Sequence, residues 1–285
     1  MNGQTLSITG SGMVSGVGLI APASCAAIRC AISNFQETRF MDSGGEWIIG
    51  SSVPLEKPWR GIPKLAKMLA SVLRECIACE PSLNINKVPI LLCLAEDDRP
   101  GRLQDLDNQI LIETQKELEI RLHEQSNIIA QGRVGLATAL SHARKLIYDK
   151  GFKHVLIAGT DSLLIGPSLQ YYEDRERLLT AENSNGFIPG EAAAAVLVQR
   201  PRRGVEPQLI CTGLGEGVEK ATVEAEDVPL RADGMVQAIR SALTEAHFDF
   251  GDLDFRIADV SGEQYGFKEA ALALTRILRQ RKAMF

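Results

Sequence analysis

Residues 185–198 read NGFIPGEAAAAVLV, and this stretch decides the fold. Two glycines and a proline around Phe187 and Ile188 predict a sharp turn, after which small and β-branched residues predict a strand buried on both faces. Four successive alanines, Ala192 to Ala195, predict that neighbouring layers approach closely there. Taken alone, the stretch fits a glycine-punctuated loop before any buried strand equally well, so the neighbouring segments must decide.

The preceding segments predict a strand, helix, strand order with short turns. Apolar residues recur at helical spacing over 132–148, residues 149–153 form a turn, and residues 155–158 (VLIA) form a buried strand that ends at Gly159-Thr160-Asp161-Ser162. Further strands are expected at 6–17 and 89–95, with a helix over 64–79 between them. This order predicts a layered α/β protein with a right-handed crossover.

Length, composition and charge exclude several classes of protein. The 285 residues are 45% apolar and 24% charged, which is typical of a globular chain that forms one large domain or two closely packed halves. A net charge of -5 argues against a nucleic-acid partner. No apolar run approaches the roughly 18 residues of a membrane helix, and the N-terminus lacks the pattern of a signal peptide. We therefore expect a cytoplasmic protein with no membrane partner.

Neither a metal nor a cofactor is expected. Of the six cysteines only Cys76 and Cys79 are close together, and no second pair or histidine lies at ligand spacing, so both are interpreted as small buried hydrophobic residues. The glycines within residues 10–18 do not fit the G-x-G-x-x-G pattern, and no G-K-S/T follows them.

Four segments resemble, in the correct order, motifs of the β-ketoacyl synthases, the condensing enzymes of the thiolase-like superfamily. Residues 6–17 (LSITGSGMVSGV) resemble V-I-T-G-x-G-x-V-S-x-x-G, residues 154–164 (HVLIAGTDSLL) resemble V-x-x-A-G-G-x-D/E-S, and NGFIPGE resembles D-G-F-x-x-G-E. Residues 250–262 resemble the I-D-Y-I-x-x-H-G segment, and a strand is predicted there at 256–260. The resemblance implies a layered thiolase-like fold (αβαβα), with a ketosynthase-like half at 1–205 and an incomplete C-terminal half at 206–285.

The nucleophile that the resemblance implies is missing. The position of the family's cysteine falls among Gln131, Gly132, Arg133 and Val134, and none of these residues carries a thiol. Condensation requires a thiolate that accepts the acyl chain as a thioester, so the position is vacant. Arg133 is expected to lie in solvent or to face an acidic partner.

The histidines of the family are missing as well. Ser261 stands where the first catalytic histidine is expected, followed by Gly262 and Glu263, and a serine cannot supply an imidazole. Ser261 and Glu263 are instead expected to cap the helix predicted at 267–279. The chain ends before the family's lysine and second histidine. The four histidines present, which form no cluster with a nucleophile, are expected at the surface or in a second layer: His123, His142, His154 and His247.

These vacancies favour a pseudoenzyme. The expected function is that of an accessory, scaffolding or chaperone-like binding subunit, similar to ketosynthase-like proteins that accompany bacterial type VI secretion effectors. The alternative is an acyl-binding or non-catalytic partner subunit of a β-ketoacyl synthase, with an acyl thioester or an acyl carrier protein as its ligand. An enzyme with relocated chemistry is the third reading.

A protein partner is expected at the strand that follows the nucleophile helix. The resemblance implies a homodimer or heterodimer through residues 154–164, with Val155, Leu156 and Ile157 on an unpaired sheet edge. An apolar edge of this kind favours association with another chain.

Overall fold

A six-stranded mixed sheet forms the centre of the protein. The computed structural model describes residues 4–202, 204, 207–225 and 227–278. The strand order is β5-β4-β6-β7-β1-β8, in which β5, β4 and β6 run parallel and the remaining neighbours run antiparallel. The bounds of these strands are β1 Leu6–Val14, β4 Ile90–Leu94, β5 Asn127–Ala130, β6 His154–Ser162, β7 Glu191–Gln199 and β8 Leu209–Cys211.

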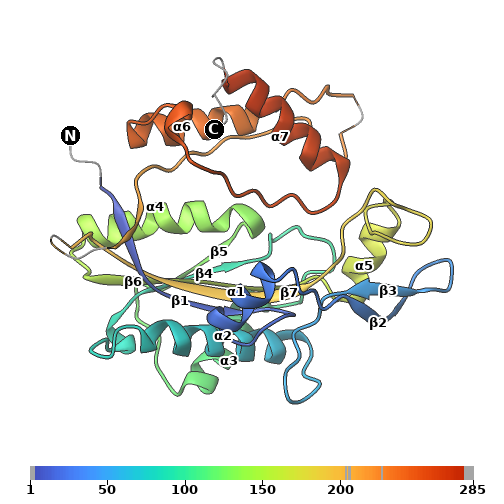
Figure 1. Ribbon diagram of the computed structural model, residues 1–285. Coiled ribbons are helices and arrows are strands. Elements are labelled where there is room, and N and C mark those ends of the chain that lie inside the picture. Colours follow the sequence, from blue (N-terminus) through green and yellow to red (C-terminus); the bar gives the residue numbers. More distant parts are fainter. Residues whose placement is uncertain (1–3, 203, 205–206, 226, 279–285) are drawn as a thin grey trace.

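Helices cover the two faces of this sheet in layers. Figure 1 shows α2 (Gly61–Ala78) and α3 (Leu106–Leu118) beneath the sheet and α4 (Gly135–Tyr148) above it, with α6 (Asp233–Ala246) and α7 (Gln264–Ile277) beyond α4. The hairpin of β2 (Gln36–Met41) and β3 (Trp47–Gly50) lies beside α5 (Gly166–Glu173) at one end of the sheet. The remaining elements are α1 (Ala21–Arg29) and three short 3-10 helices: η1 Ile85–Lys87, η2 Gly132–Val134 and η3 Phe250–Asp252. The predicted layered α/β fold is confirmed.

The main core lies between α2 and the sheet. The buried face of α2 includes Leu65, Met68, Leu69 and Leu73, which pack against apolar side chains of β4, β6 and β7. A second core forms where α4 packs against β4, β5 and β6 on the opposite face. These two cores account for the helical apolar spacing in the sequence, since each helix buries one apolar side.

Glycines bring the backbone of a neighbouring segment into direct contact with a helix in both parts of the chain: β1 in the first part and the segment after β8 in the second. A Cβ on Gly10 would lie 2.9 Å from the carbonyl oxygen of Cys76 in α2, and a Cβ on Gly12 would overlap the carbonyl oxygen of Val72. Close approach of layers was predicted at the alanines of β7, and the glycine contacts show it at β1, the strand that pairs with β7. The same arrangement recurs near the C-terminus, where three alternate glycines face backbone carbonyls of α6: Gly213, Gly215 and Gly217.

The strand predicted after NGFIPGE is confirmed as β7, but its first half is buried on one face only. Ala192 and Ala194 are exposed, whereas Ala193 and Ala195 are buried in the α2 core. The prediction of burial on both faces is wrong here because α4 packs against β4, β5 and β6 and does not extend over the start of β7.

The predicted dimer seam is wrong in its premise. β6 is an interior strand, paired with β4 on one side and β7 on the other, so Val155, Leu156 and Ile157 are not on a sheet edge. All three side chains are buried in the two cores. The edge strand in this region is β5, which precedes α4 along the chain.

The C-terminal part contributes helices without a second large sheet. The strand predicted at 256–260 is absent from the described residues, and Phe255 and Ile257 are 78% and 90% exposed. A strand requires a neighbour for its backbone hydrogen bonds, and no described segment pairs with these residues. The division of the chain near residue 205 stays a prediction, and β8, just beyond it, pairs with β1 in the main sheet.

Gly12→Ala is expected to destabilise the protein by about 1–3 kcal/mol. The added methyl group would overlap the Val72 carbonyl, so β1 and α2 would have to separate. Denaturant unfolding followed by circular dichroism measures the effect. Gly251→Ala is the matched control, because a Cβ there meets no atom within 4 Å. Equal stability of the two variants would show that the β1–α2 contact does not constrain the fold.

Candidate functional site

Residues 131–134, where the sequence predicts a vacant nucleophile position, lie beside an open pocket at the carboxyl ends of β4 and β5. Its volume is about 500 Å³, and its lining consists of Glu96, Asp97, Asp98, Ala130, Gln131, Arg133 and Val134. Of the predicted residues 131–134, Gln131, Arg133 and Val134 line the pocket together with three acidic residues that the sequence interpretation missed. The sequence contained a signal for these three acidic residues. They directly follow the predicted strand at 89–95, and the carboxyl ends of neighbouring parallel strands lie side by side.

A carboxylate occupies the space beside the turn between β5 and α4. Gly132 has a φ of +50°, and a Cβ built on it would overlap the side-chain carboxylate of Glu96. A side chain at this position, including that of a cysteine, would require Glu96 to move and the backbone to adopt a conformation that favours glycine. Among the residues that line this pocket there is no cysteine, serine or histidine.

The other residues of the turn have structural contacts. Gln131 accepts a hydrogen bond from the Thr138 hydroxyl of α4 at 2.6 Å. Arg133 and Asp259 lie 4.0 Å apart as a largely solvated ion pair. Arg133 was expected either to lie in solvent or to face an acidic partner, and its side chain does both. A solvated pair of this kind contributes about 0–1 kcal/mol to stability.

Glu263, two residues after Ser261, forms a half-buried ion pair with Arg177. The guanidinium donates to both carboxylate oxygens, at 2.7 and 3.1 Å. The predicted helix cap is wrong, because Glu263 is the N-cap residue of α7 but makes no side-chain cap bond. The arginine engages its carboxylate instead. Ser261, two residues earlier, is exposed.

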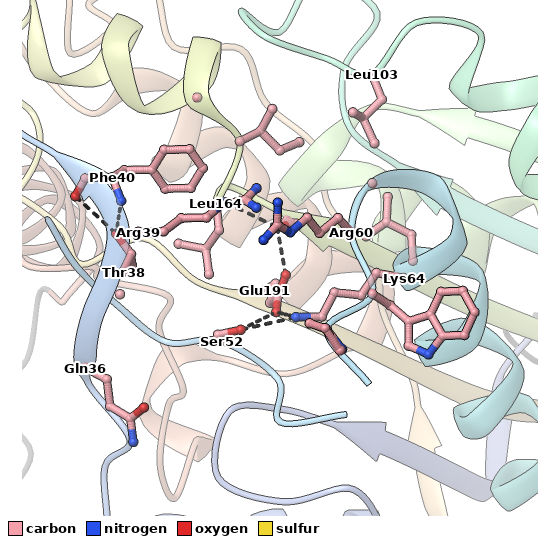
Figure 2. Close-up of a pocket in the computed structure, with 18 of the residues that line it drawn as sticks. Gln36, Thr38, Arg39, Phe40, Ser52, Arg60, Lys64, Leu103, Leu164 and Glu191 are labelled. Atoms are coloured by element: carbon pink, nitrogen blue, oxygen red, sulfur yellow. Dashed lines mark hydrogen bonds and ion pairs between the residues drawn. The ribbon is translucent and has the colours of Figure 1, made fainter. Parts of the chain in front are cut away.

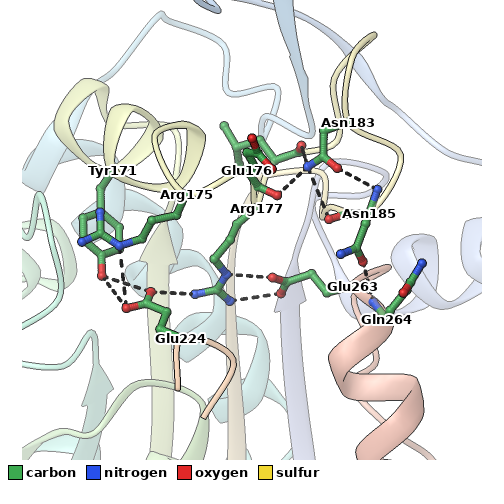
Figure 3. A network of polar contacts seen from close by, with 10 residues as sticks. Tyr171, Arg175, Glu176, Arg177, Asn183, Asn185, Glu224, Glu263 and Gln264 are labelled. Carbon is green, nitrogen blue, oxygen red and sulfur yellow. Dashed lines mark hydrogen bonds and ion pairs between the residues drawn. The ribbon is translucent and has the colours of Figure 1, made fainter. Parts of the chain in front are cut away.

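The turn at residues 185–187 (NGF) contacts the loop that precedes α7, as Figure 3 shows. Asn185 accepts a hydrogen bond from the backbone N–H of Gln264 at 2.7 Å, and a Cβ on Gly262 would lie 2.7 Å from the carbonyl oxygen of Gly186. Arg177 also faces Glu224 at 3.4 Å and lies over the ring of Phe187. The turn that resembles a ketosynthase motif therefore joins the α5 region to the start of α7.

Two titratable groups of α7 lie near Arg133. Burial and the nearby Glu219 carboxylate raise the pKa of Glu269, although Arg133 opposes this shift. Burial raises the pKa of Tyr265 to about 12, and its hydroxyl donates to the carbonyl oxygen of Ala221 at 2.7 Å. Tyr265 is therefore protonated at neutral pH and acts as a hydrogen-bond donor to the backbone.

No metal or membrane element is found in the described part of the chain. Within it, no group of three or more His, Cys, Asp and Glu side chains could hold a metal ion. None of its helices combines the length and apolar character needed to cross a bilayer. Of the cysteine pair, Cys76 is buried as expected, whereas Cys79 is exposed.

Comparisons with known proteins agree on the fold. No protein-family model and no curated protein matches the chain. Among solved structures, it is similar to one described as a type II polyketide synthase acyl-carrier protein in complex with its ketosynthase (AntDE:AntF), with a TM-score of 0.75 and 14% identity. That match covers 98% of this chain and 78% of the other.

Two further structures show the same relation. The ketosynthase ApeO in complex with its chain length factor ApeC, from Xenorhabdus doucetiae, matches with a TM-score of 0.70 and 14% identity over 98% of this chain and 77% of that one. The ketosynthase from module 6 of the bacillaene synthase of Bacillus subtilis 168 matches at 0.72 and 13%, over 98% and 54%. The chain therefore has the layered α/β fold of the thiolase-like ketosynthases.

Proposed function

We propose that this protein is a non-catalytic, ketosynthase-fold subunit that acts by binding a protein partner. The observation that carries the proposal is that residues 131–134, the predicted nucleophile position, include no thiol, and that the carboxylate of Glu96 fills the space beside Gly132. Acyl transfer of the ketosynthase type begins with a thiolate nucleophile, and this pocket offers none.

The cysteine nearest to the pocket, Cys93, is a poor candidate for a nucleophile at a different position. Cys93 lies in β4 beneath the start of α4, where its Sγ would be 3.5 Å from a Cβ on Gly135. Burial raises the pKa of this thiol to about 11. It is therefore protonated at neutral pH, and a thiol reacts far more slowly than a thiolate.

The charge of the pocket also disfavours an anionic acyl donor. Glu96, Asp97 and Asp98 face one arginine, Arg133, which is itself near Asp259. A ligand that carries phosphate or carboxylate groups would meet a surplus of negative charge there. The acyl-binding alternative stays open for a neutral ligand, because the pocket volume of about 500 Å³ is within the usual range of small-molecule sites.

The edge of the sheet next to this pocket suits a protein partner. Among the described strands β5 pairs with β4 alone, so the other side of its backbone could pair with a strand from another chain. Val134 and Leu136, at the start of α4, are 65% and 52% exposed. The similar structures described as complexes of a ketosynthase with a chain length factor or an acyl-carrier protein support a protein partner for this fold.

We infer that the partner is a second copy of the chain or a related ketosynthase-fold chain that pairs along β5. This moves the predicted seam from Val155, Leu156 and Ile157 to the edge strand. The link to type VI secretion effectors rests on the resemblance alone and stays a prediction.

Incubation of the protein with malonyl and acyl thioesters is expected to leave its intact mass unchanged. The reason is the absence of a thiolate in the pocket at Gly132. Intact-protein mass spectrometry reads the outcome, with a ketosynthase that has its active-site cysteine as the positive control. A covalent acyl adduct at any residue would disprove the non-catalytic proposal, and loss of that adduct in Cys93→Ser would place the chemistry at Cys93.

The double variant Val134→Glu, Leu136→Glu is expected to convert a dimer into a monomer. Two carboxylates would then be desolvated at the β5 edge without partners. Multi-angle light scattering measures the mass, and Ile112→Glu, an equally drastic change at an exposed site on α3, is the control. Dimers in both variants would exclude the β5 edge. If the purified wild-type protein is a monomer, a second copy of the chain is excluded as the partner, and a related ketosynthase-fold chain remains.

A further inference from the structure

A second cavity lies on the other side of the sheet, at the start of α2. Its volume is about 460 Å³, and it is enclosed by the β2–β3 hairpin, the first turn of α2 and the segment that follows β6. None of its lining residues belongs to the pocket at Gly132. A site here would therefore be distinct from the vacant nucleophile position, and it does not depend on the proposed function.

The floor of this cavity is polar, and its charges are satisfied. Glu191, whose side chain is 4% exposed, pairs with Lys64 of α2. Its two oxygens also accept hydrogen bonds from the Ser52 hydroxyl at 2.9 Å, the Val53 N–H at 2.8 Å and the Ser162 hydroxyl at 2.9 Å. The floor therefore attracts neither a cation nor an anion strongly.

The space above the floor is positively charged. Figure 2 shows Arg39, from β2, and Arg60, which precedes α2, extending from opposite sides toward the space above Glu191. No carboxylate in the described part of the chain lies within 4.0 Å of either guanidinium. Two cations directed at one space repel each other, and an anion placed between them would relieve that repulsion.

The start of α2 adds to the positive potential. Arg60 is the N-cap residue of this 18-residue helix, no side chain caps its first turn, and no acidic residue lies in that turn. The free N–H groups and the helix dipole therefore favour an anion at the same place. This contribution supports the two guanidinium groups and would not define a site without them.

The walls are apolar, so the ligand must have an apolar body. The apolar part of the lining consists mainly of Phe40, Trp59, Leu65, Leu103, Leu164 and Ile165. A cavity with predominantly apolar walls and a few convergent polar groups is typical of a small-molecule site, and about 460 Å³ lies within the usual range.

The net charge of the lining indicates a monoanion. Arg39, Arg60 and Lys64 are opposed by Glu37 and Glu191, which leaves one net positive charge. A guanidinium matches the geometry of a carboxylate through paired N–H donors. We propose that this cavity binds a small monocarboxylate with an apolar tail, its carboxylate between Arg39 and Arg60 and its tail against the leucine and isoleucine side chains.

The first test is a calorimetric titration of the purified protein with octanoate. Saturable binding is expected with a Kd below about 1 mM. Octanol and acetate, which each lack one half of the proposed ligand, are expected to bind at least about tenfold more weakly, a loss of about 1.4 kcal/mol. Absence of saturable octanoate binding overturns the proposal, and so does octanol that binds as tightly as octanoate. Tighter binding of octyl phosphate would overturn the assignment of a monoanion.

Variants locate the site. Arg39→Gln and Arg60→Gln are each expected to weaken octanoate binding by about tenfold, because each removes one charged partner of the carboxylate. Leu103→Trp is expected to abolish binding by filling the cavity. Arg29→Gln, an exposed arginine on α1, is the matched control. Circular dichroism confirms that each variant is folded, and binding unchanged in both cavity arginine variants overturns the proposal.

Discussion

The buried carboxylate of Glu191 joins the segments on which the rest of the structure depends. It stands at the start of β7, pairs with Lys64 at the start of α2, and accepts hydrogen bonds from residues after β3 and at the end of β6. Removing one partner of such a buried pair typically costs about 3–5 kcal/mol, because the other charge is left without compensation. The turn NGFIPGE therefore places a charge that fixes α2 on the sheet. The same contact forms the floor of the α2 cavity.

The other end of that turn joins the C-terminal helices to the sheet. Asn185 and Gly186 contact the loop before α7, and Arg177 holds Glu263 with two hydrogen bonds. Glu263 lies two residues after Ser261, the predicted position of a missing histidine. The loop before α7 is thus held by contacts with Arg177, Asn185 and Gly186.

Local sequence patterns predicted where helices and strands form better than they predicted which of these elements lie side by side. The apolar periodicity of α4 and the VLIA run of β6 identified a helix and a strand correctly, because both signals depend on residues close in sequence. That β6 is an interior strand depends on pairing with β4 and β7, whose positions are remote in the sequence. The absence of a strand at 256–260 has the same origin, since a strand needs a partner. The overlap of Glu96 with the space beside Gly132 and the convergence of Arg39 and Arg60 are likewise contacts between distant segments.

The two cavities differ in charge, and this difference bears on what the fold can do. The pocket at Gly132 has three carboxylates and one arginine, whereas the cavity at α2 has a net positive charge. Both lie at the end of the sheet where the parallel strands finish. The pocket at Gly132 is at the ends of β4 and β5 near α4, and the other cavity is at the end of β6 near α2. Because electrostatic attraction is strongest for opposite charge, an organic anion would favour the α2 cavity over the pocket beside Gly132. The ligand proposed for the α2 cavity therefore does not depend on a nucleophile in the pocket beside Gly132, because the two sets of lining residues are separate.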